Sequence, residues 1–278
     1  MLSMSDTLFR MAGERHDERM QAVAIATRLD YYYFQGTNED SVIHYTNKVK
    51  EFAKATHQPK YYYFAWANRL VTYYLKTSRT NIALYEVQNM LKEAQEEDDK
   101  TGLSRCYNIM SQIYTIKRFD SMAFEWRLKE IELTEKYNIE NYNISQTYAQ
   151  IANYYISQKK QKEALRAVEK AISTANSSTQ QISAKLEYVN YYSKFGDFQA
   201  AEKILKECQI AFEQDKRLES IKKRLYNIEC LYYQQTRQYQ KALEAAEMQE
   251  KEEHRLSESI LSSSHYRTQG EICLLYTS

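Results

Sequence analysis

Glycine and proline are scarce in this sequence, which contains five glycines and one proline among 278 residues. Average proteins contain about 7% glycine and about 5% proline. Strands, hairpins and phosphate-binding loops rely on these two residues for tight turns and for close approach of the backbone. Their scarcity predicts long helices joined by short connections, and the abundant Ala, Glu, Lys, Gln and Leu are good helix formers.

A surplus of one charge is also missing, because 38 basic residues balance 37 acidic ones to a formal net charge of +1. The two signs are interspersed along the chain. No basic stripe is therefore available for the row of phosphate contacts that nucleic acid requires. We expect no nucleic-acid partner.

Long apolar runs are absent as well. No stretch approaches the ~20 apolar residues that a membrane-spanning helix needs. The first residues, Met1–Arg10, lack the continuous apolar core of a secretory signal. As written, the sequence predicts a cytoplasmic chain with no membrane insertion.

Residues that could carry chemistry are scattered. The five histidines and four cysteines show no CxxC spacing, and HExxH, GxSxG and phosphate-loop motifs are missing. We therefore expect no cofactor, no metal site and no catalytic residue. The cysteines are expected to act as small buried apolar side chains. They are Cys106, Cys208, Cys230 and Cys273.

A repeat of about forty residues is present along the chain. In residues 184–216 an apolar helical face ends at Tyr192, a Gly-Asp-Phe turn follows at 196–198, and a second helical pattern begins with the small Ala201. Other segments fit the same frame, and their equivalent tyrosines lie 42, 40, 41, 37 and 41 residues apart. The aligned tyrosines are Tyr32, Tyr74, Tyr114, Tyr155, Tyr192 and Tyr233.

An aromatic residue near a helix end, a tight turn and a small residue in the next helix together resemble the tetratricopeptide repeat (TPR), whose usual period is 34. In that family small residues lie where the two helices of a pair cross. The resemblance implies an all-α, right-handed superhelical solenoid of about six antiparallel helix pairs. Two positions depart from the pattern: Ser41 replaces the small alanine of the first unit, and Arg127 stands where an apolar residue is usual.

The repeats predict one continuous domain over residues 17–278, after a lead-in at 1–16. Its units lie near 17–56, 59–98, 101–138, 141–176, 179–215 and 217–256, with a partial seventh unit at 258–278. Solenoids usually end on a polar capping helix, whereas this chain stops inside the first helix of its seventh unit. Residues Cys273–Ser278 also resemble a translated adaptor sequence, so we expect the sequence to be a fragment of a longer native chain.

Turn residues agree with these boundaries. Thr37–Asp40 matches a capping box that opens a helix near Glu39. Pro59 suits the first turn of a helix, where its missing N–H has no partner to lose. Gly36 and Gly196 suit the left-handed position that ends a helix.

A TPR fold implies a concave groove lined by the first helix of each pair. The family's groove positions correspond here to Asn68, Thr72, Arg105, Asn108, Gln112, Gln146, Ala149, Asn153, Asn190, Lys194, Arg224 and Asn227. An asparagine recurs in five consecutive units, and a side-chain amide offers both a donor and an acceptor to the backbone of an extended peptide. The alternative is that asparagine is simply tolerated on a wet face. The Lys/Asn/Lys/Arg set of chaperone-binding TPR domains is not supplied by the first two full units.

The tyrosine-rich segments Tyr31–Gly36 and Tyr61–Trp66 resemble the N-terminal TPR sensor region of bacterial membrane-bound histidine kinases. That resemblance implies a non-catalytic domain binding a protein or peptide in its groove, with a periplasmic location and a kinase downstream of this segment. The alternative is a stand-alone cytoplasmic scaffold or adaptor. A peptide-pheromone receptor of Gram-positive bacteria ranks third, because Met1–His16 is too short for the helical bundle or DNA-binding unit that precedes the repeats there.

Overall fold

The computed structural model describes residues 2–36, 38–139, 141, 143–252 and 255, and the regular structure of these residues is helical. The chain divides into two compact units, with the boundary between Phe119 and Asp120. We call them the N-terminal unit, described up to Phe119, and the C-terminal unit, described from Asp120. Each is treated separately below.

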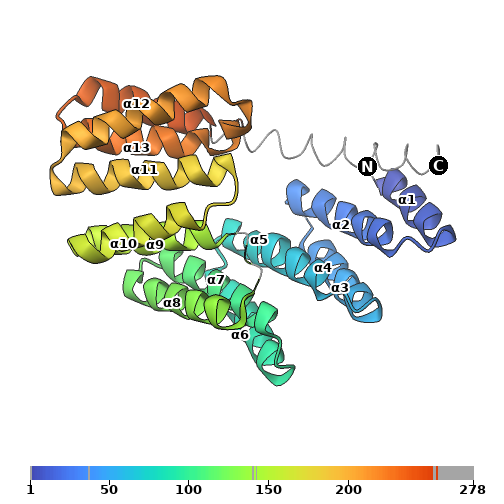
Figure 1. The fold of residues 1–278 in the computed structure, drawn as a ribbon. Helices are drawn as coiled ribbons and strands as arrows, with labels where there is room; N and C mark the ends of the chain where they lie inside the picture. Colours follow the sequence, from blue (N-terminus) through green and yellow to red (C-terminus); the bar gives the residue numbers. More distant parts are fainter. Residues whose placement is uncertain (1, 37, 140, 142, 253–254, 256–278) are drawn as a thin grey trace. The chain divides into compact units, whose positions relative to one another are not determined.

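The N-terminal unit is built from consecutive antiparallel helices (Figure 1). They are α1 Leu2–Glu14, α2 Glu18–Gln35, α3 Glu39–Ala55, α4 Pro59–Ala65, η1 Trp66–Val71, α5 Thr72–Lys76, α6 Thr80–Glu96 and α7 Lys100–Ile116. Helix α1 falls in the segment for which the sequence predicted only a lead-in. It forms because Leu8 and Ala12 pack against Met20 and Ala24 of α2.

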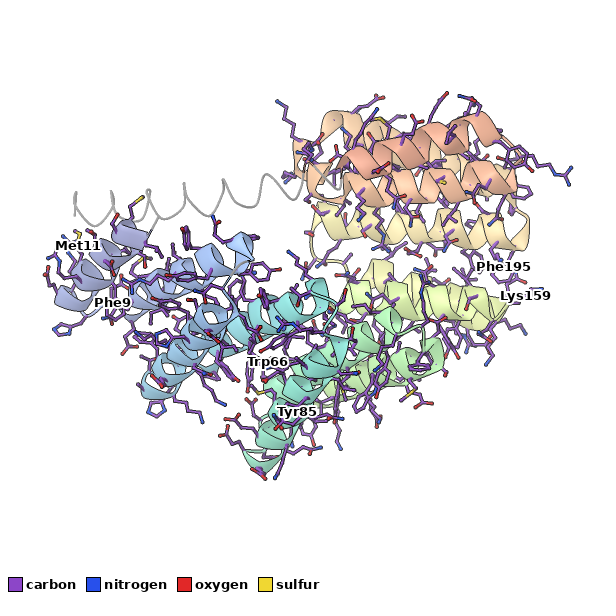
Figure 2. All side chains as sticks on the ribbon, turned by 180° about the vertical axis from the view of Figure 1, so that it is seen from behind. Phe9, Met11, Trp66, Tyr85, Lys159 and Phe195 are labelled. Atoms are coloured by element: carbon purple, nitrogen blue, oxygen red, sulfur yellow. The ribbon has the colours of Figure 1, made fainter. Side chains whose placement is uncertain are left out.

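Helices α4 and α5 form one continuous helix interrupted by the π-helical segment η1. A π turn leaves backbone carbonyls without their usual partners. The hydroxyl of Thr72 donates to one of them, the carbonyl of Ala67, at 3.0 Å. Trp66, in the same segment, is 1% exposed and lies among the packed helices of this unit (Figure 2).

The C-terminal unit repeats the antiparallel arrangement. Its helices are α8 Asp120–Tyr137, α9 Ile144–Ser157, α10 Gln161–Ser173, α11 Ser178–Phe195, α12 Phe198–Gln214, the 3-10 helix η2 Lys216–Ile221 and α13 Lys222–Gln235, and residues 239–252 are also helical. Helix α11 contacts both α9 and α13. The first helices of three successive pairs therefore lie next to one another in this unit.

The prediction of an all-α array of antiparallel helix pairs is confirmed over the described residues. The boundaries of the repeat units and the single continuous domain remain predictions. The partial seventh unit at 258–278, including Cys273–Ser278, lies outside the described residues.

The small residues of the repeat pattern lie at closely packed helix crossings. Ala83, Ala123, Ala164 and Ala201 are fully buried, and Ala242 is 5% exposed. A methyl group leaves room for the neighbouring backbone, and larger apolar side chains fill the space on either side. Around Ala201 these larger side chains include Leu186, Val189 and Leu205.

The aligned tyrosines occupy the same position in successive turns. In five of the six, the tyrosine carbonyl accepts a backbone hydrogen bond from the residue five positions later, at 2.8 or 2.9 Å. The pairs are Tyr74–Arg79, Tyr114–Phe119, Tyr155–Lys160, Tyr192–Asp197 and Tyr233–Gln238. This bond closes a Schellman turn, in which the residue before the donor adopts a left-handed conformation.

Glycine takes the left-handed position in only two of these turns, at Gly36 with φ 67° and Gly196 with φ 87°, as predicted. The equivalent residues elsewhere are Ser78, Arg118, Lys159 and Arg237, with φ between 57° and 63°. A side chain in this region costs about 1–2 kcal/mol relative to the right-handed form. The scarcity of glycine therefore results in strained turns that the tertiary packing must hold in place.

Helix α3 begins at Glu39, as predicted, but its N-cap is Asn38, whose Oδ1 accepts from the backbone N–H of Ser41 at 2.9 Å. Thr37, expected to cap this helix, lies outside the described residues. Pro59 opens α4 as predicted. The short spacing of 37 residues has a simple origin, because α10 contains 13 residues whereas α3, α6 and α12 contain 17.

Candidate functional site

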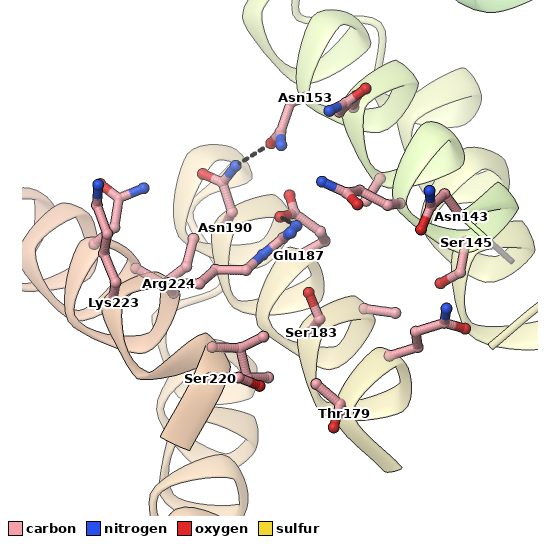
Figure 3. A pocket seen from close by; sticks show the side chains of 18 of the residues that line it. Asn143, Ser145, Asn153, Thr179, Ser183, Glu187, Asn190, Ser220, Lys223 and Arg224 are labelled. Atoms are coloured by element: carbon pink, nitrogen blue, oxygen red, sulfur yellow. Dashed lines mark hydrogen bonds and ion pairs between the residues drawn. The ribbon is translucent and has the colours of Figure 1, made fainter. Parts of the chain in front are cut away.

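A groove of ≈ 710 Å³ opens in the C-terminal unit between α9, α11 and the segment formed by η2 and α13 (Figure 3). Twelve of its twenty lining residues carry a side-chain amide or hydroxyl. Pockets for small apolar ligands are lined mainly by hydrophobic and aromatic residues. The composition of this groove instead suits a ligand that forms many hydrogen bonds.

Helical periodicity places these polar groups on one face of α11. Thr179, Ser183, Glu187 and Asn190 follow one another at spacings of four and three residues, so their side chains project from the same side of the helix. An adjacent face carries Leu186 and Val189, which pack against α12 and α13. Burial of that apolar side therefore fixes which residues of α11 face the groove.

Two asparagines pair across the groove. The Nδ2 of Asn190 on α11 donates a hydrogen bond to the Oδ1 of Asn153 on α9 at 2.7 Å (Figure 3). A side-chain amide carries an acceptor oxygen and an NH₂ group with two donor hydrogens. The pairing therefore leaves the NH₂ of Asn153 and the oxygen of Asn190 for a ligand.

A buried ion pair joins α11 to α13 beside these amides. The Nη2 of Arg224 donates to Oε1 of Glu187, whose side chain is 2% exposed. The second carboxylate oxygen, Oε2, has no hydrogen-bond partner among the described residues. A buried charged acceptor without a partner costs free energy, and such an atom in a ligand-sized groove points to a missing donor.

Arg127 on α8 holds a side chain of the groove lining in place. Its side chain is 8% exposed, and its Nε donates to Oε1 of Gln150, which lines the groove, at 2.9 Å. Burial lowers the pKa of the Arg127 guanidinium, and the nearby carboxylates of Glu130 and Asp120 oppose that shift. Since Gln150 accepts from Arg127, its NH₂ group remains available to the groove.

The predicted groove residues of the C-terminal unit largely come together. Gln146, Ala149, Asn153, Asn190, Arg224 and Asn227 line the groove. Lys194 does not, because it lies one turn beyond Asn190, near the end of α11, with an exposed side chain. The sequence interpretation missed Glu187, Ser183 and Gln150, although Glu187 and Ser183 continue the stripe that leads to Asn190.

Four of the five predicted groove residues of the N-terminal unit are hydrogen-bonded in pairs. Arg105 donates from Nη2 to Oδ1 of Asn68 at 2.7 Å. Gln112 donates from Nε2 to Oδ1 of Asn108, also at 2.7 Å. Thr72 is bonded to the backbone of the π segment. These five residues do not line the groove of the C-terminal unit.

Burial keeps the thiols of two cysteines in their protonated form. Cys106 and Cys208 are buried, and burial raises the pKa of their thiols to about 12 and about 11. Cys230 is partly exposed, and Cys273 lies outside the described residues. Within the described part of the chain, no three His, Cys, Asp or Glu side chains gather as metal ligands do. Over the same residues, no helix combines the length and apolar character needed to span a membrane.

No family model matches the sequence, and no match was found among curated proteins. Solved structures match the fold. The apo form of RapI aligns with a TM-score of 0.62 at 12% identity, over 90% of each chain. BtubC (BKLC) from P. vanneervenii aligns with a TM-score of 0.58 at 14% identity, over 78% of this chain and 90% of that one.

A Rap protein complexed with competence and sporulation factor aligns with a TM-score of 0.54 at 15% identity, over 90% of this chain and 74% of that chain. At such identities the likeness establishes the fold alone. The chain is a TPR-like helical-repeat protein, and its resemblance to histidine-kinase sensor regions stays a prediction.

Proposed function

We propose that this protein is a non-catalytic peptide-binding protein that holds an extended peptide in the groove between α9, α11 and α13. We further propose that it is the sensory or partner-binding part of a bacterial signal-transduction protein. Binding would favour one arrangement of the helix pairs over another, and an attached output module would respond to that shift.

The Asn153–Asn190 pair is the observation that carries this proposal. An extended peptide offers one N–H and one C=O per residue, and both need partners when the peptide enters a groove. The paired amides present one free donor group and one free acceptor to such a peptide unit. Because neutral amides recognise the backbone, they bind a peptide with little regard to its side chains.

A Rap protein of similar fold is solved in complex with competence and sporulation factor, and this likeness in fold supports binding of a ligand by the helical repeats. The same likeness supports a second candidate, a receptor for a secreted peptide signal. Both candidates use the groove in the same way and differ in the source of the peptide. The scaffold remains the alternative if the ligand is a segment of a constitutive partner.

The proposal is tested by selecting peptides from a random displayed library on the full chain. The selected peptides are then synthesised with a fluorescent label, and their dissociation constants are measured by fluorescence polarisation. The double variant Asn153→Ala/Asn190→Ala should weaken binding about tenfold or more, since it removes two hydrogen bonds to the backbone.

The matched control is Asn68→Ala/Asn108→Ala, which changes the equivalent residues of the N-terminal unit. This variant should alter the dissociation constants by less than about twofold. Equal weakening by both variants, or no effect of either, would overturn the assignment of the ligand to this groove. A library that yields no peptide binding the unaltered chain would overturn the peptide-binding function itself.

A further inference from the structure

The Oε2 atom of Glu187 is the unpartnered buried side-chain atom in the described part of the chain. It belongs to a side chain that is 2% exposed and that lines the groove. Figure 3 shows the carboxylate between the Arg224 guanidinium and the asparagine pair. Oε2 itself has almost no accessible surface, so a ligand donor reaches it from the groove only after a small shift of the neighbouring side chains.

Charge in the groove limits which donor fits. Among the described lining residues Glu187 is the acid and Lys223 and Arg224 are the bases, so the formal charge is −1 + 2 = +1. A ligand cation at Oε2 would lie beside Arg224 and raise the local positive charge further. A ligand carboxylate would compete with Glu187 for Arg224 and leave one of two close negative groups unpaired.

An uncharged N–H group avoids both penalties. We infer that Glu187 is a ligand-binding residue whose Oε2 accepts a hydrogen bond from an uncharged amide N–H of the peptide. This inference rests on the proposed function and names the chemistry that the groove recognises next to the asparagine pair. The amide is either a backbone N–H or the side-chain carboxamide of a glutamine or asparagine.

Arg224 completes the recognition of that amide. Its bond to Oε1 holds the carboxylate so that Oε2 remains free, and the remaining N–H groups of the guanidinium can donate to a ligand carbonyl. An acceptor and a donor side by side match an amide, which carries both an N–H and a C=O. Glu187 and Asn190 are three residues apart, or about 4.5 Å along α11, so they would contact amides one or two residues apart in an extended peptide.

The inference is tested with capped peptides acetyl-Ser-Ala-Xaa-Ala-Ser-amide, in which Xaa is Gln, Ala, Lys or Glu. Their dissociation constants for the full chain are measured by isothermal titration calorimetry. The Gln peptide should bind more tightly than the Lys and Glu peptides. A weak Ala peptide identifies the side-chain carboxamide as the donor. An Ala peptide equal to the Gln peptide, but weakened by N-methylation at Xaa, identifies the backbone.

The decisive variant is Glu187→Gln, which keeps the shape of the side chain but places an NH₂ donor where Oε2 accepts. It should weaken the Gln peptide about tenfold, because two donors then face each other. The melting temperature should change little, because the carboxamide oxygen of Gln still accepts from Arg224, whose side chain is 26% exposed. The matched control is Glu202→Gln on α12, an exposed acid paired with Lys206, which should not change binding.

The outcomes separate this inference from the proposed function. Wild-type affinity in Glu187→Gln, together with weak binding in Asn153→Ala/Asn190→Ala, overturns the role of Glu187 and leaves the peptide groove intact. A Lys peptide that binds more tightly than the Gln peptide, and loses that advantage in Glu187→Gln, overturns the uncharged donor. Failure of every peptide to bind the unaltered chain overturns the proposed function and this inference with it.

Discussion

The two units carry the same recurring asparagine but use it differently. In the N-terminal unit Asn68 accepts from Arg105, and Asn108 accepts from Gln112. In the C-terminal unit Asn190 donates to Asn153, and both asparagines line the groove. A repeat position therefore does not by itself mark a binding site.

The buried ion pairs of the two units show the same contrast. In the N-terminal unit Arg69 pairs with Asp30 and also lies 5.1, 5.5 and 4.9 Å from the ring centres of Tyr33, Phe34 and Phe64. Its charge is thus neutralised and its surface covered by rings. The pair in the groove of the C-terminal unit instead has an empty acceptor. The first arrangement stabilises the fold, whereas the second leaves a buried carboxylate oxygen that we propose a ligand fills.

The largest effect should come from Arg69→Met, because it removes an ion pair and contacts with three rings at once. We expect the free energy of unfolding to fall by about 2–4 kcal/mol. Urea denaturation followed by circular dichroism measures the loss, and hydrogen exchange should locate it in residues 18–35 and 59–76. The control, Arg217→Met, breaks an exposed pair with Asp215 and should leave the midpoint unchanged. If both variants lower the free energy of unfolding equally, the ring contacts of Arg69 do not contribute to stability.

Replacing the Glu187–Arg224 pair should change the stability of the protein in the opposite direction. Replacing both charges, in Glu187→Met/Arg224→Met, removes a buried carboxylate that lacks a full set of partners. We expect the free protein to become more stable by about 1–3 kcal/mol, while peptide affinity is lost. Thermal unfolding with and without the selected peptide measures both effects. If the double variant instead destabilises the free chain, the pair is structural and the contrast between the units disappears.

Much of the fold could be predicted because its signals are local. The tyrosine period and the small alanines recur at fixed spacing, and Gly36, Gly196 and Pro59 mark helix ends through their own backbone preferences. Helix α1 was missed because its apolar residues become informative only once α2 provides a partner. The π segment was missed because no residue type requires it.

The site was harder to predict, because the difference between the units depends on partners far apart in the chain. Asn68 and Arg105 are 37 residues apart, as are Asn153 and Asn190, and periodicity does not tell which such pairs close on themselves. Glu187 was overlooked because a glutamate in a charged helical sequence is usually a surface residue. Arg127, in contrast, stood out as a misfit to the repeat, and it proved to support Gln150.

A smaller effect should be common to both units, because both contain turns with a side chain in the left-handed region. Ser78→Gly in the N-terminal unit and Lys159→Gly in the C-terminal unit should each stabilise the fold by about 0.5–1 kcal/mol. Both side chains are exposed, so little contact is lost. Gly196→Ala should destabilise by about 1 kcal/mol, since its added methyl meets no atom within 4 Å and only the backbone is strained. If the urea midpoints of these variants equal that of the unaltered chain, the left-handed turns carry no strain.

The smallest predicted effect is a difference between the two units in how their stability depends on pH. Burial would raise the pKa of Glu93 in the N-terminal unit, but hydrogen bonds from Lys50 at 2.6 Å and Lys54 at 3.0 Å outweigh it, and the pKa is lowered. Stability from Glu93 is therefore present at neutral pH and lost as the pH falls through the lowered pKa.

In the C-terminal unit burial raises the pKa of Glu229, and a hydrogen bond from Gln209 opposes this shift only in part. An acid with a raised pKa stabilises the fold below its unfolded pKa and loses that contribution as the pH rises through the folded value.

The two glutamine variants should thus have opposite signs at pH 7. Glu93→Gln should destabilise the chain and Glu229→Gln should stabilise it, each by about 1 kcal/mol or less. Both differences from the unaltered chain should shrink once the pH has fallen through the folded pKa of each group, because a protonated carboxyl group resembles the amide that replaces it. Urea midpoints measured at pH 7 and at successively lower pH values follow the difference. Effects of the same sign at pH 7 would mean that burial, and not the pairing of each carboxylate, decides how both units respond to acid.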